Sequence, residues 1–582
     1  MPSTRIKILS LVFYLVGFLI LIRLFYWQVI KADELAALGE SQRFISFEIP
    51  AKRGRILAQD GFPLADNQRS FLLYASLKDL KKNPDEIASQ IAPFLVDEID
   101  EDKIATPSLL EDVKNEELTN TEEAVKSRLK RADLAWVPLK HKITQETKEQ
   151  IESLKLPGIG FEDEETRFYP EGSSSAHLLG FVGKDRSGED VGYFGLEGYY
   201  NRELEGRKGK AELEKDAAGK PILVGKEKED KVRNGRDLLT TIDRGIQYLV
   251  EKKLEEGVQR YGAKKGSVVI LNPKTGALLA LASYPTYEPQ KYTEYDKEEF
   301  RNPIVAESFE PGSVFKIIVM SAALEEKAVE PETRCTFCHG PKTIAEYTIE
   351  TWDQKYHPQS TMTEVIQNSD NIGMIFVGEK LGDEKLYHYL KKFGFGEKTK
   401  IDLEEEADPP LREYQDWSSV DLATITFGQG IAITPIQMIT ATSAIANKGI
   451  LMQPHLVQKI IGQTAVEIPP KKVREVISED TAVKITQMMV NAVEKGEARW
   501  AKPEGYQIAG KTGTAQIPIK GHYDTEKTIA SFVGFAPADN PKFIMLVTLR
   551  EPSTSPWGSE TAAPLFFDIA KELFTYLGIP PS

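Results

Sequence analysis

Apolar residues in this 582-residue chain fall into stretches of different kinds, and the first is a long run near the N-terminus. Between residues 8 and 30 the only charged side chain is Arg23, and as a helix this run would be about 34 Å long. Arg5 and Lys7 precede it and favour a cytoplasmic N-terminus. We therefore predict a cytoplasmic tail at residues 1–7 and an uncleaved transmembrane signal anchor at residues 8–30, with a buried core helix as the alternative.

Residues 31–245 have a different pattern, in which charged clusters and turn residues separate short apolar segments. Residues 206–236 are rich in glycine and charge and almost lack large apolar side chains, which predicts a linker or an exposed hairpin. No group of residues typical of catalysis stands out in this region. We predict an extracytoplasmic pedestal domain that holds the following domain away from the membrane.

From residue 246 to residue 582, helical and strand patterns alternate, and we predict a further domain over this range. Asp243 can cap a helix whose apolar face contains Ile246, Val250 and Leu254, together with Leu249. Two predicted strands follow at residues 268–271 and 277–282, and a helix-rich segment begins at Ser313.

The last part of the chain returns to strand patterns. Strands are predicted at residues 507–517, 531–536 and 543–549, and an amphipathic helix at residues 562–577 closes the chain. An antiparallel sheet built from both ends of the domain, with a helical subdomain inserted between them, is an α+β fold.

A serine and a lysine three residues apart begin the helical segment. Ser313 follows Pro-Gly, and Lys316 precedes the apolar run at residues 317–324, so both are expected on one face at the first turn of a helix. A hydroxyl is a weak nucleophile until a base removes its proton, and a partly desolvated lysine can be that base.

Two further motifs follow in the chain, Ser-Asp-Asn at residues 369–371 and Lys-Thr-Gly-Thr at residues 511–514. Ser-x-x-Lys, Ser-Asp-Asn and Lys-Thr-Gly in this order are the signature of penicillin-binding proteins and class A β-lactamases. A second Lys-Thr-Gly, at residues 274–276, precedes the serine and lies between two predicted strands. We interpret that copy as a hairpin turn.

Composition and charge exclude some classes of function and indicate the number of structural units. The net charge of −15 and the hydrophobic content of 41% suit a globular body and argue against nucleic-acid binding, which requires basic surfaces. The length predicts about three or four structural units, and no fixed repeat is present.

The chain has two cysteines, Cys335 and Cys338, followed by His339. Cys-x-x-Cys-His can attach haem, or it can supply half of a zinc site with His357 or Asp353 nearby in sequence. A local disulfide between the two cysteines, or two free thiols in a surface loop, would fit the same spacing.

The three motifs, with the anchor and the pedestal, make the chain resemble a monofunctional class B penicillin-binding protein, a peptidoglycan D,D-transpeptidase, over nearly its whole length. Phe-Gly-Phe-Gly at residues 393–396 and Phe-Gly-Gln-Gly at residues 427–430 resemble the division-type (septal) branch. Residues 406–410, Glu-Ala-Asp-Pro-Pro, depart from the Gly-rich turn of that branch, so an elongation-type enzyme stays an alternative.

This resemblance implies roles for the motif residues. Ser313 would attack the penultimate D-Ala carbonyl of a stem peptide and release the terminal D-Ala, and Lys316 would take the serine proton. Ser369 and Asn371 would relay protons and position the substrate. Lys511 would supply positive charge near the substrate carboxylate.

The same resemblance implies the remaining substrate contacts on the Lys-Thr-Gly-Thr segment. Thr512 and Thr514 would hydrogen-bond the substrate carboxylate, and the backbone N–H groups of Ser313 and Thr514 would form the oxyanion hole. Gly513 would let the substrate approach the strand closely.

The implied partners are peptidoglycan stem peptides, the lipid-linked precursor polymer, β-lactams, a SEDS-family glycosyltransferase and divisome membrane proteins; no cofactor is implied. A D,D-carboxypeptidase differs only in the acceptor. A β-lactamase or β-lactam sensor shares the motifs but lacks the anchor and pedestal. A catalytically silent scaffold of wall synthesis is the alternative from another functional class.

Overall fold

The computed structural model describes residues 2–96, 107–131, 133–214, 227–519 and 522–581. The chain divides into two compact units, one formed by residues 1–53 and 205–235 and the other by residues 54–204 and 236–582. The domain boundaries predicted from the sequence, at residues 7, 30 and 245, stay predictions.

The first unit contains the apolar N-terminal helix. Helix α1 (Pro2–Phe25) continues into a single π-helical turn, η1 (Tyr26–Ile30), and is followed by helix α2 (Ala32–Arg43). Residues Thr4–Ile30 form a helix long and apolar enough to cross a membrane, and their apolar side chains are exposed. Strand β8 (Gly209–Glu214) pairs on its two sides with β1 (Phe44–Ile49) and β9 (Glu227–Asp230), so the hairpin interpretation of this segment is confirmed for the described residues.

The second unit begins with a lobe built around one long strand, β3 (Pro63–Ser76), which pairs with β4 (Trp136–Ile143) and β5 (Ile159–Phe168). Phe71 and Leu73 on β3 are buried against apolar side chains of neighbouring helices. The helices of this lobe are α3 (Pro84–Ile91), η2 (Ala92–Phe94), α4 (Pro107–Leu129) and α5 (Gln145–Ser153).

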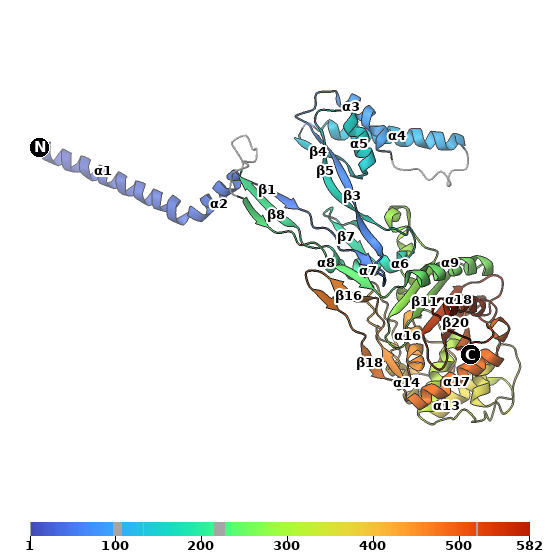
Figure 1. The fold of residues 1–582 in the computed structure, drawn as a ribbon. Helices are drawn as coiled ribbons and strands as arrows, with labels where there is room; N and C mark the ends of the chain where they lie inside the picture. The colour runs from blue at the N-terminus through green and yellow to red at the C-terminus, as the bar shows by residue number, and fades with distance from the viewer. Residues whose placement is uncertain (1, 97–106, 132, 215–226, 520–521, 582) are drawn as a thin grey trace. The chain divides into compact units, whose positions relative to one another are not determined.

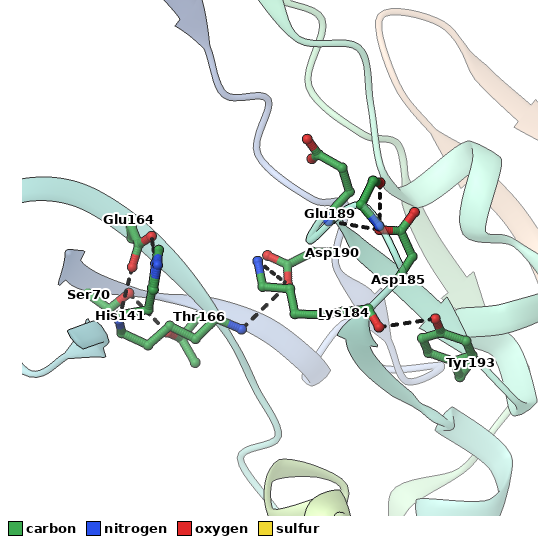
Figure 2. A network of polar contacts seen from close by, with 11 residues as sticks. Ser70, His141, Glu164, Thr166, Lys184, Asp185, Glu189, Asp190 and Tyr193 are labelled. Atoms are coloured by element: carbon green, nitrogen blue, oxygen red, sulfur yellow. Dashed lines mark hydrogen bonds and ion pairs between the residues drawn. The ribbon is translucent and has the colours of Figure 1, made fainter. Parts of the chain in front are cut away.

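Polar contacts connect this lobe to a short hairpin, β6 (Phe181–Lys184) and β7 (Asp190–Tyr193), as Figure 2 shows. The carboxylate of Asp190 lies 3.0 Å from Nζ of Lys184 and 3.5 Å from Nζ of Lys142. Nδ1 of His141 lies 2.7 Å from the carboxylate of Glu164 on β5. Because these side chains are partly exposed to solvent, we expect each pair to stabilise the fold only slightly.

A buried ion pair fixes the segment after β5. Nε of Arg167 lies 2.6 Å from Oε1 of Glu197, and both side chains are almost completely buried. Removing one partner of such a pair leaves an uncompensated buried charge. Glu197 lies on α7 (Gly195–Tyr199), so this contact joins two segments of the chain that are 30 residues apart.

The C-terminal part of the second unit is a domain built on a five-stranded antiparallel sheet, shown in Figure 1, whose strand order is β12-β11-β21-β20-β19. Its strands come from both ends of the domain, as predicted, which confirms the α+β fold. The strands are β11 (Lys265–Leu271), β12 (Leu278–Tyr284), β19 (Ala509–Ile519), β20 (His522–Ala536) and β21 (Phe543–Arg550).

Both faces of the sheet are covered by helices. Successive side chains of a strand point to opposite faces, so neighbouring residues belong to different cores. On β11, Val268 and Ile270 belong to the core formed with helices α9 (Arg244–Tyr261) and α18 (Ala562–Tyr576). Val269 and Leu271 belong to the second core, which contains the inserted helices. The longer inserted helices are α11 (Lys316–Glu325), α13 (Asn371–Leu381), α14 (Asp383–Lys392), α16 (Pro435–Ala446) and α17 (Glu479–Lys495).

Two local predictions are confirmed by this arrangement. Asp243 caps α9 by accepting a hydrogen bond from the backbone N–H of Ile246. The early Lys-Thr-Gly segment forms the turn between β11 and β12, where the backbone N–H of Lys274 donates to the side chain of Asn272 and Gly276 has a φ of 77°. This copy of the motif is therefore structural.

Candidate active site

Ser313 lies on a 3-10 turn, η6 (Gly312–Phe315), which leads directly into α11. The sequence predicted that Ser313 would lie on the first turn of the helix itself. In the structure it lies on the 3-10 turn that immediately precedes the α-helix. Gly312 has a φ of 59°, and a Cβ atom there would lie 2.8 Å from the carbonyl oxygen of Thr514. Glycine therefore lets the turn pack closely against β19, and Ser313 faces the cleft between them.

Lys316 is the first residue of α11 and has no exposed surface. Its Nζ donates to the carbonyl oxygen of Ser369 and to Oδ1 of Asn371, the latter at 2.8 Å, and lies 3.4 Å from Oγ of Ser369. In the described part of the chain no hydrogen bond joins this amine to Ser313. Burial lowers the pKa of Lys316 well below its ordinary value, and the positive charge of Lys511 lowers it further. A neutral amine of this kind can accept a proton.

The Ser-Asp-Asn motif lies at the junction of α12 (Met362–Gln367) and α13. Ser369 has a φ of 55°, a left-handed conformation that is uncommon for a residue other than glycine. Asp370 caps α13 by accepting hydrogen bonds from two backbone N–H groups of its first turn. Nδ2 of Asn371 donates to a backbone carbonyl, which leaves its Oδ1 for the Lys316 amine. The backbone strain at Ser369 is of a kind that is typical of functional sites.

Lys511 reaches the same serine from strand β19. Its Nζ lies 2.9 Å from Oγ of Ser369, 3.1 Å from Oγ1 of Thr512 and 3.2 Å from the carbonyl oxygen of Thr512. Burial lowers the pKa of Lys511 to about 8, against the opposing effect of the Glu497 carboxylate. The structure therefore brings the serine and lysine residues of all three motifs to one cleft.

Gly513 and Thr514 continue β19 along this cleft. A Cβ atom on Gly513 would lie 2.4 Å from Oγ of Ser531 and 2.8 Å from Cγ1 of Val314, so packing inside the protein already requires a glycine here. Close approach of substrate, the reason expected from the family resemblance, stays a prediction. Oγ1 of Thr514 accepts a hydrogen bond from the backbone N–H of Gly558 at 2.9 Å, so its own hydrogen can be donated to a ligand.

Residues outside the three motifs complete the walls of the cleft. Trp352 and Trp557, which are more than 200 positions apart, meet edge to face with ring centroids 5.2 Å apart. Both line the cleft, together with Glu497 and with Phe427 and Gln429 of the Phe-Gly-Gln-Gly segment. Sequence reasoning did not identify either tryptophan or Glu497, because no motif marks them and only the fold brings them together.

The two cysteines form a disulfide between Cys335 and Cys338, one of the possibilities that their spacing left open. Sulfur atoms bonded to each other cannot ligate zinc as thiolates, and the zinc hypothesis with His339 is therefore wrong for this form of the protein. A haem thioether would need the same sulfurs. Within the described residues, no group of three or more His, Cys, Asp or Glu side chains is arranged to hold a metal ion.

Comparison with protein families gives two matches that follow each other along the chain. Residues 48–240 match the penicillin-binding protein dimerisation domain. Residues 266–571 match the penicillin-binding protein transpeptidase domain, which contains every motif residue described above.

Individual relatives are similar over almost the whole chain. The chain is 33% identical over 579 residues to stage V sporulation protein D of Bacillus subtilis, with 98% of this chain and 85% of the relative covered. It is 28% identical over 563 residues to the probable peptidoglycan D,D-transpeptidase PenA of Neisseria gonorrhoeae, with 96% and 90% covered. Among solved structures, penicillin-binding protein 3 of Mycobacterium tuberculosis complexed with aztreonam superposes with a TM-score of 0.68 at 25% identity, covering 92% of this chain and 98% of that one.

Proposed function

The chain belongs to the class B penicillin-binding proteins and is a serine D,D-transpeptidase of peptidoglycan, and from this premise we propose that Ser313 is its nucleophile. Its hydroxyl attacks the carbonyl carbon of the penultimate D-Ala in a stem peptide. The C–N bond to the terminal D-Ala breaks, and an acyl ester on Ser313 remains. An amine of a neighbouring stem peptide then attacks this ester, forms the cross-linking amide and frees the serine.

Lys316 is the base that accepts the Ser313 proton. The observation that carries this role is the complete burial of an amine whose nearest acceptors belong to the Ser-Asp-Asn motif. Burial favours the neutral form of a lysine, which is the form with a lone pair to accept a proton. The hydroxyl of Ser369 passes a proton to the departing D-Ala nitrogen, and Asn371 positions both the amine and the substrate.

Lys511, Thr512 and Thr514 bind the terminal carboxylate of the stem peptide. A buried, positively charged lysine next to two hydroxyl groups on the same strand suits a carboxylate ligand. The backbone N–H groups of Ser313 and Thr514 hold the developing oxyanion, a contribution of roughly 3 kcal/mol per donor in comparable hydrolases. The close packing of Gly312 against Thr514 supports a fixed distance between these two segments.

β-Lactams acylate the same serine. The cyclic amide presents a carboxylate and a reactive carbonyl in the arrangement of a D-Ala-D-Ala end, and the similar penicillin-binding protein 3 is described in complex with aztreonam. We expect the acyl ester to be lost slowly, and slow loss of the adduct would distinguish the chain from a β-lactamase.

The N-terminal helix is a single-pass anchor in the cytoplasmic membrane, with the catalytic domain on the extracytoplasmic side. The support is the length and apolar exposed surface of Thr4–Ile30 and the positive charges that precede the apolar run. The lipid-linked precursor polymer, a SEDS-family glycosyltransferase and divisome membrane proteins are the partners that this location gives access to.

The process served is septal wall synthesis. The Phe-Gly-Phe-Gly and Phe-Gly-Gln-Gly segments support this branch, and the second of them lines the cleft through Phe427 and Gln429. Wall synthesis during sporulation is the second candidate, since a relative 33% identical over 98% of this chain is named a sporulation protein. An elongation role is the third.

The experiment that tests the reaction is intact mass analysis of the full-length protein in detergent after treatment with penicillin, followed by peptide mapping. We expect one stable adduct, located on Ser313, and none in the Ser313→Ala variant. Rapid turnover of the drug would indicate a hydrolase, and an adduct on another residue would overturn the assignment. Incubation with lipid-linked polymer then separates a transpeptidase, which makes cross-linked dimers, from a carboxypeptidase, which only releases D-Ala.

A further inference from the structure

A carboxylate outside the three motifs lies in the wall of the active-site cleft. Glu497 is in the short segment between α17 and the 3-10 turn η8 (Arg499–Ala501). Its Oε2 lies 3.4 Å from Oγ1 of Thr512, and its Oε1 is buried without a hydrogen-bond partner in the described structure. Among the described residues that line the cleft, it is the only one with a carboxylate. The mechanism proposed above does not use it.

A buried carboxylate oxygen without a partner costs free energy unless opposite charge lies nearby. The charged groups that face Glu497 are Lys511 on β19, Lys316 on α11 and Asp353 from the loop beside Trp352. Two of these three are the lysines of the active site. The two amines therefore stabilise the negative charge of Glu497. In turn, this negative charge favours the protonated form of each amine.

The hydrogen bonds connect Glu497 to one of the two amines. Nζ of each lysine contacts three oxygens, so the number of contacts does not distinguish the two amines, but their partners differ. One of these oxygens, Oγ1 of Thr512, also contacts Glu497. A hydroxyl that accepts from an ammonium group can donate its own hydrogen to a carboxylate, so Thr512 connects the two charges.

We propose that the Glu497 carboxylate is a positioning residue that acts through Thr512 to keep Lys511 in its ammonium form, so that Lys316 is the neutral amine of the pair. This inference rests on the function proposed above, in which Lys316 is the base and Lys511 binds the substrate carboxylate. The amines of Lys316 and Lys511 both contact the hydroxyl of Ser369. In the proposed mechanism one of these amines is a charged ammonium group and the other is neutral. Because Thr512 connects Glu497 to Lys511, the carboxylate favours the proton on Lys511.

The electrostatics of the cleft agree with this arrangement. Burial lowers the pKa of Lys511 to about 8, and Glu497 is the group that opposes this effect. The pKa of Lys316 is lowered first by burial and then by the charge of Lys511, while Asp370 and Glu497 oppose both. Burial raises the pKa of Glu497 itself, and the charges of Lys511 and Lys316 work against that rise. Removing the Glu497 charge would therefore lower the pKa of both lysines.

The test is the pH dependence of acylation by a carboxylate-bearing fluorescent penicillin, measured on the full-length protein in detergent between about pH 5 and 10. In the wild type, the rising acid limb reports loss of the Lys316 proton and the falling alkaline limb reports loss of the Lys511 proton. We expect Glu497→Gln to move both limbs to lower pH, the alkaline limb by about one pH unit. The variant would then be faster than the wild type on the acid side and slower on the alkaline side.

Two matched variants serve as controls. Glu497→Asp keeps the carboxylate, and its profile should stay close to that of the wild type. Glu494→Gln removes an exposed carboxylate from the last turn of α17, one that pairs with Lys502, and should leave both limbs in place. If the Gln variant does not fold, Glu497→Ala removes the same charge and repeats the test.

A uniform loss of rate with both limbs unmoved would mean that Glu497 only supports the local structure, and would overturn the inference. An unchanged profile would show that the side chain is already neutral, with the same conclusion. Neither result would affect the proposed function, which instead depends on the adduct on Ser313 in the wild-type protein.

Discussion

Nζ of Lys511 lies 2.9 Å from Oγ of Ser369, although the two residues are 142 positions apart in the chain. The lysine comes from strand β19 of the sheet and the serine from the inserted helical subdomain. The contact therefore joins the two parts of the domain at the cleft. Since the same hydroxyl also lies 3.4 Å from Nζ of Lys316, Ser369 connects the two buried amines. In the mechanism proposed above, the charge states of these amines determine how acylation depends on pH.

The alkaline limit of acylation should reflect Lys511. Burial lowers the pKa of Lys511 to about 8, below the ordinary value for lysine, so its positive charge is present below that pH and is lost above it. We expect the acylation rate for a carboxylate-bearing β-lactam to fall as pH rises through about 8. Stopped-flow rates over a pH series measure this limb.

An esterified β-lactam, which has no carboxylate, is the control for this prediction. Because it gains nothing from the Lys511 charge, its slower acylation should not show the same decline near pH 8. An equal decline for both compounds would mean that the limb belongs to another group.

Replacement of Lys316 tests the base directly. Lys316→Met keeps most of the side-chain volume in a completely buried position but removes the amine that contacts Ser369 and Asn371. Loss of a general base typically lowers a rate by about 100- to 10,000-fold, and we expect a loss of that order in the acylation rate. Intact mass analysis against time measures it, with circular dichroism to show that the fold persists. Acylation at the wild-type rate would place the base elsewhere.

Much of this site could be predicted from the sequence, because the chemistry is carried by short motifs whose order along the chain is informative. The Ser-x-x-Lys, Ser-Asp-Asn and Lys-Thr-Gly segments meet in one cleft, and the early Lys-Thr-Gly copy is a turn, as its position between two strands indicated. The antiparallel sheet followed from strand periodicity, since buried strands have a recognisable apolar pattern.

What could not be predicted depends on three-dimensional packing. Sequence spacing suggested that the Lys316 amine would lie beside Ser313, but its hydrogen bonds are to Ser369 and Asn371, which reach it from another helix. Nothing local to Glu497 distinguishes it from the many other acidic residues of the chain. Its effect on the two lysines arises only when α17 and β19 bring separate segments to one cleft.

Gly513 should tolerate no side chain. In Gly513→Ala the added methyl group would lie 2.4 Å from Oγ of Ser531 and 2.8 Å from Cγ1 of Val314, both inside the domain. Forcing extra volume into a packed region typically costs about 1–3 kcal/mol. We expect a lower Tm and slower acylation, because the shift would displace β19 relative to the Ser313 turn.

Gly340→Ala is the matched control for Gly513→Ala, since a Cβ atom on Gly340 would meet no other atom within 4 Å. Its Tm and acylation rate should equal those of the wild type. If Gly513→Ala were as stable and as active as this control, the strand would have to be free to move away from Val314.

The disulfide between Cys335 and Cys338 should contribute to stability and not to catalysis. Both residues are buried in the core of the catalytic domain, and the loop they close is short, so the chain-entropy model gives about 2 kcal/mol for the bond. We expect the double variant Cys335→Ala/Cys338→Ala to unfold at lower denaturant concentration while Ser313 is still acylated by penicillin. Chemical denaturation and labelling of the same samples measure both properties. Zinc added to reduced wild-type protein provides the opposing test, because stoichiometric binding with a rise in Tm would show that the pair serves as a metal site when the bond is open.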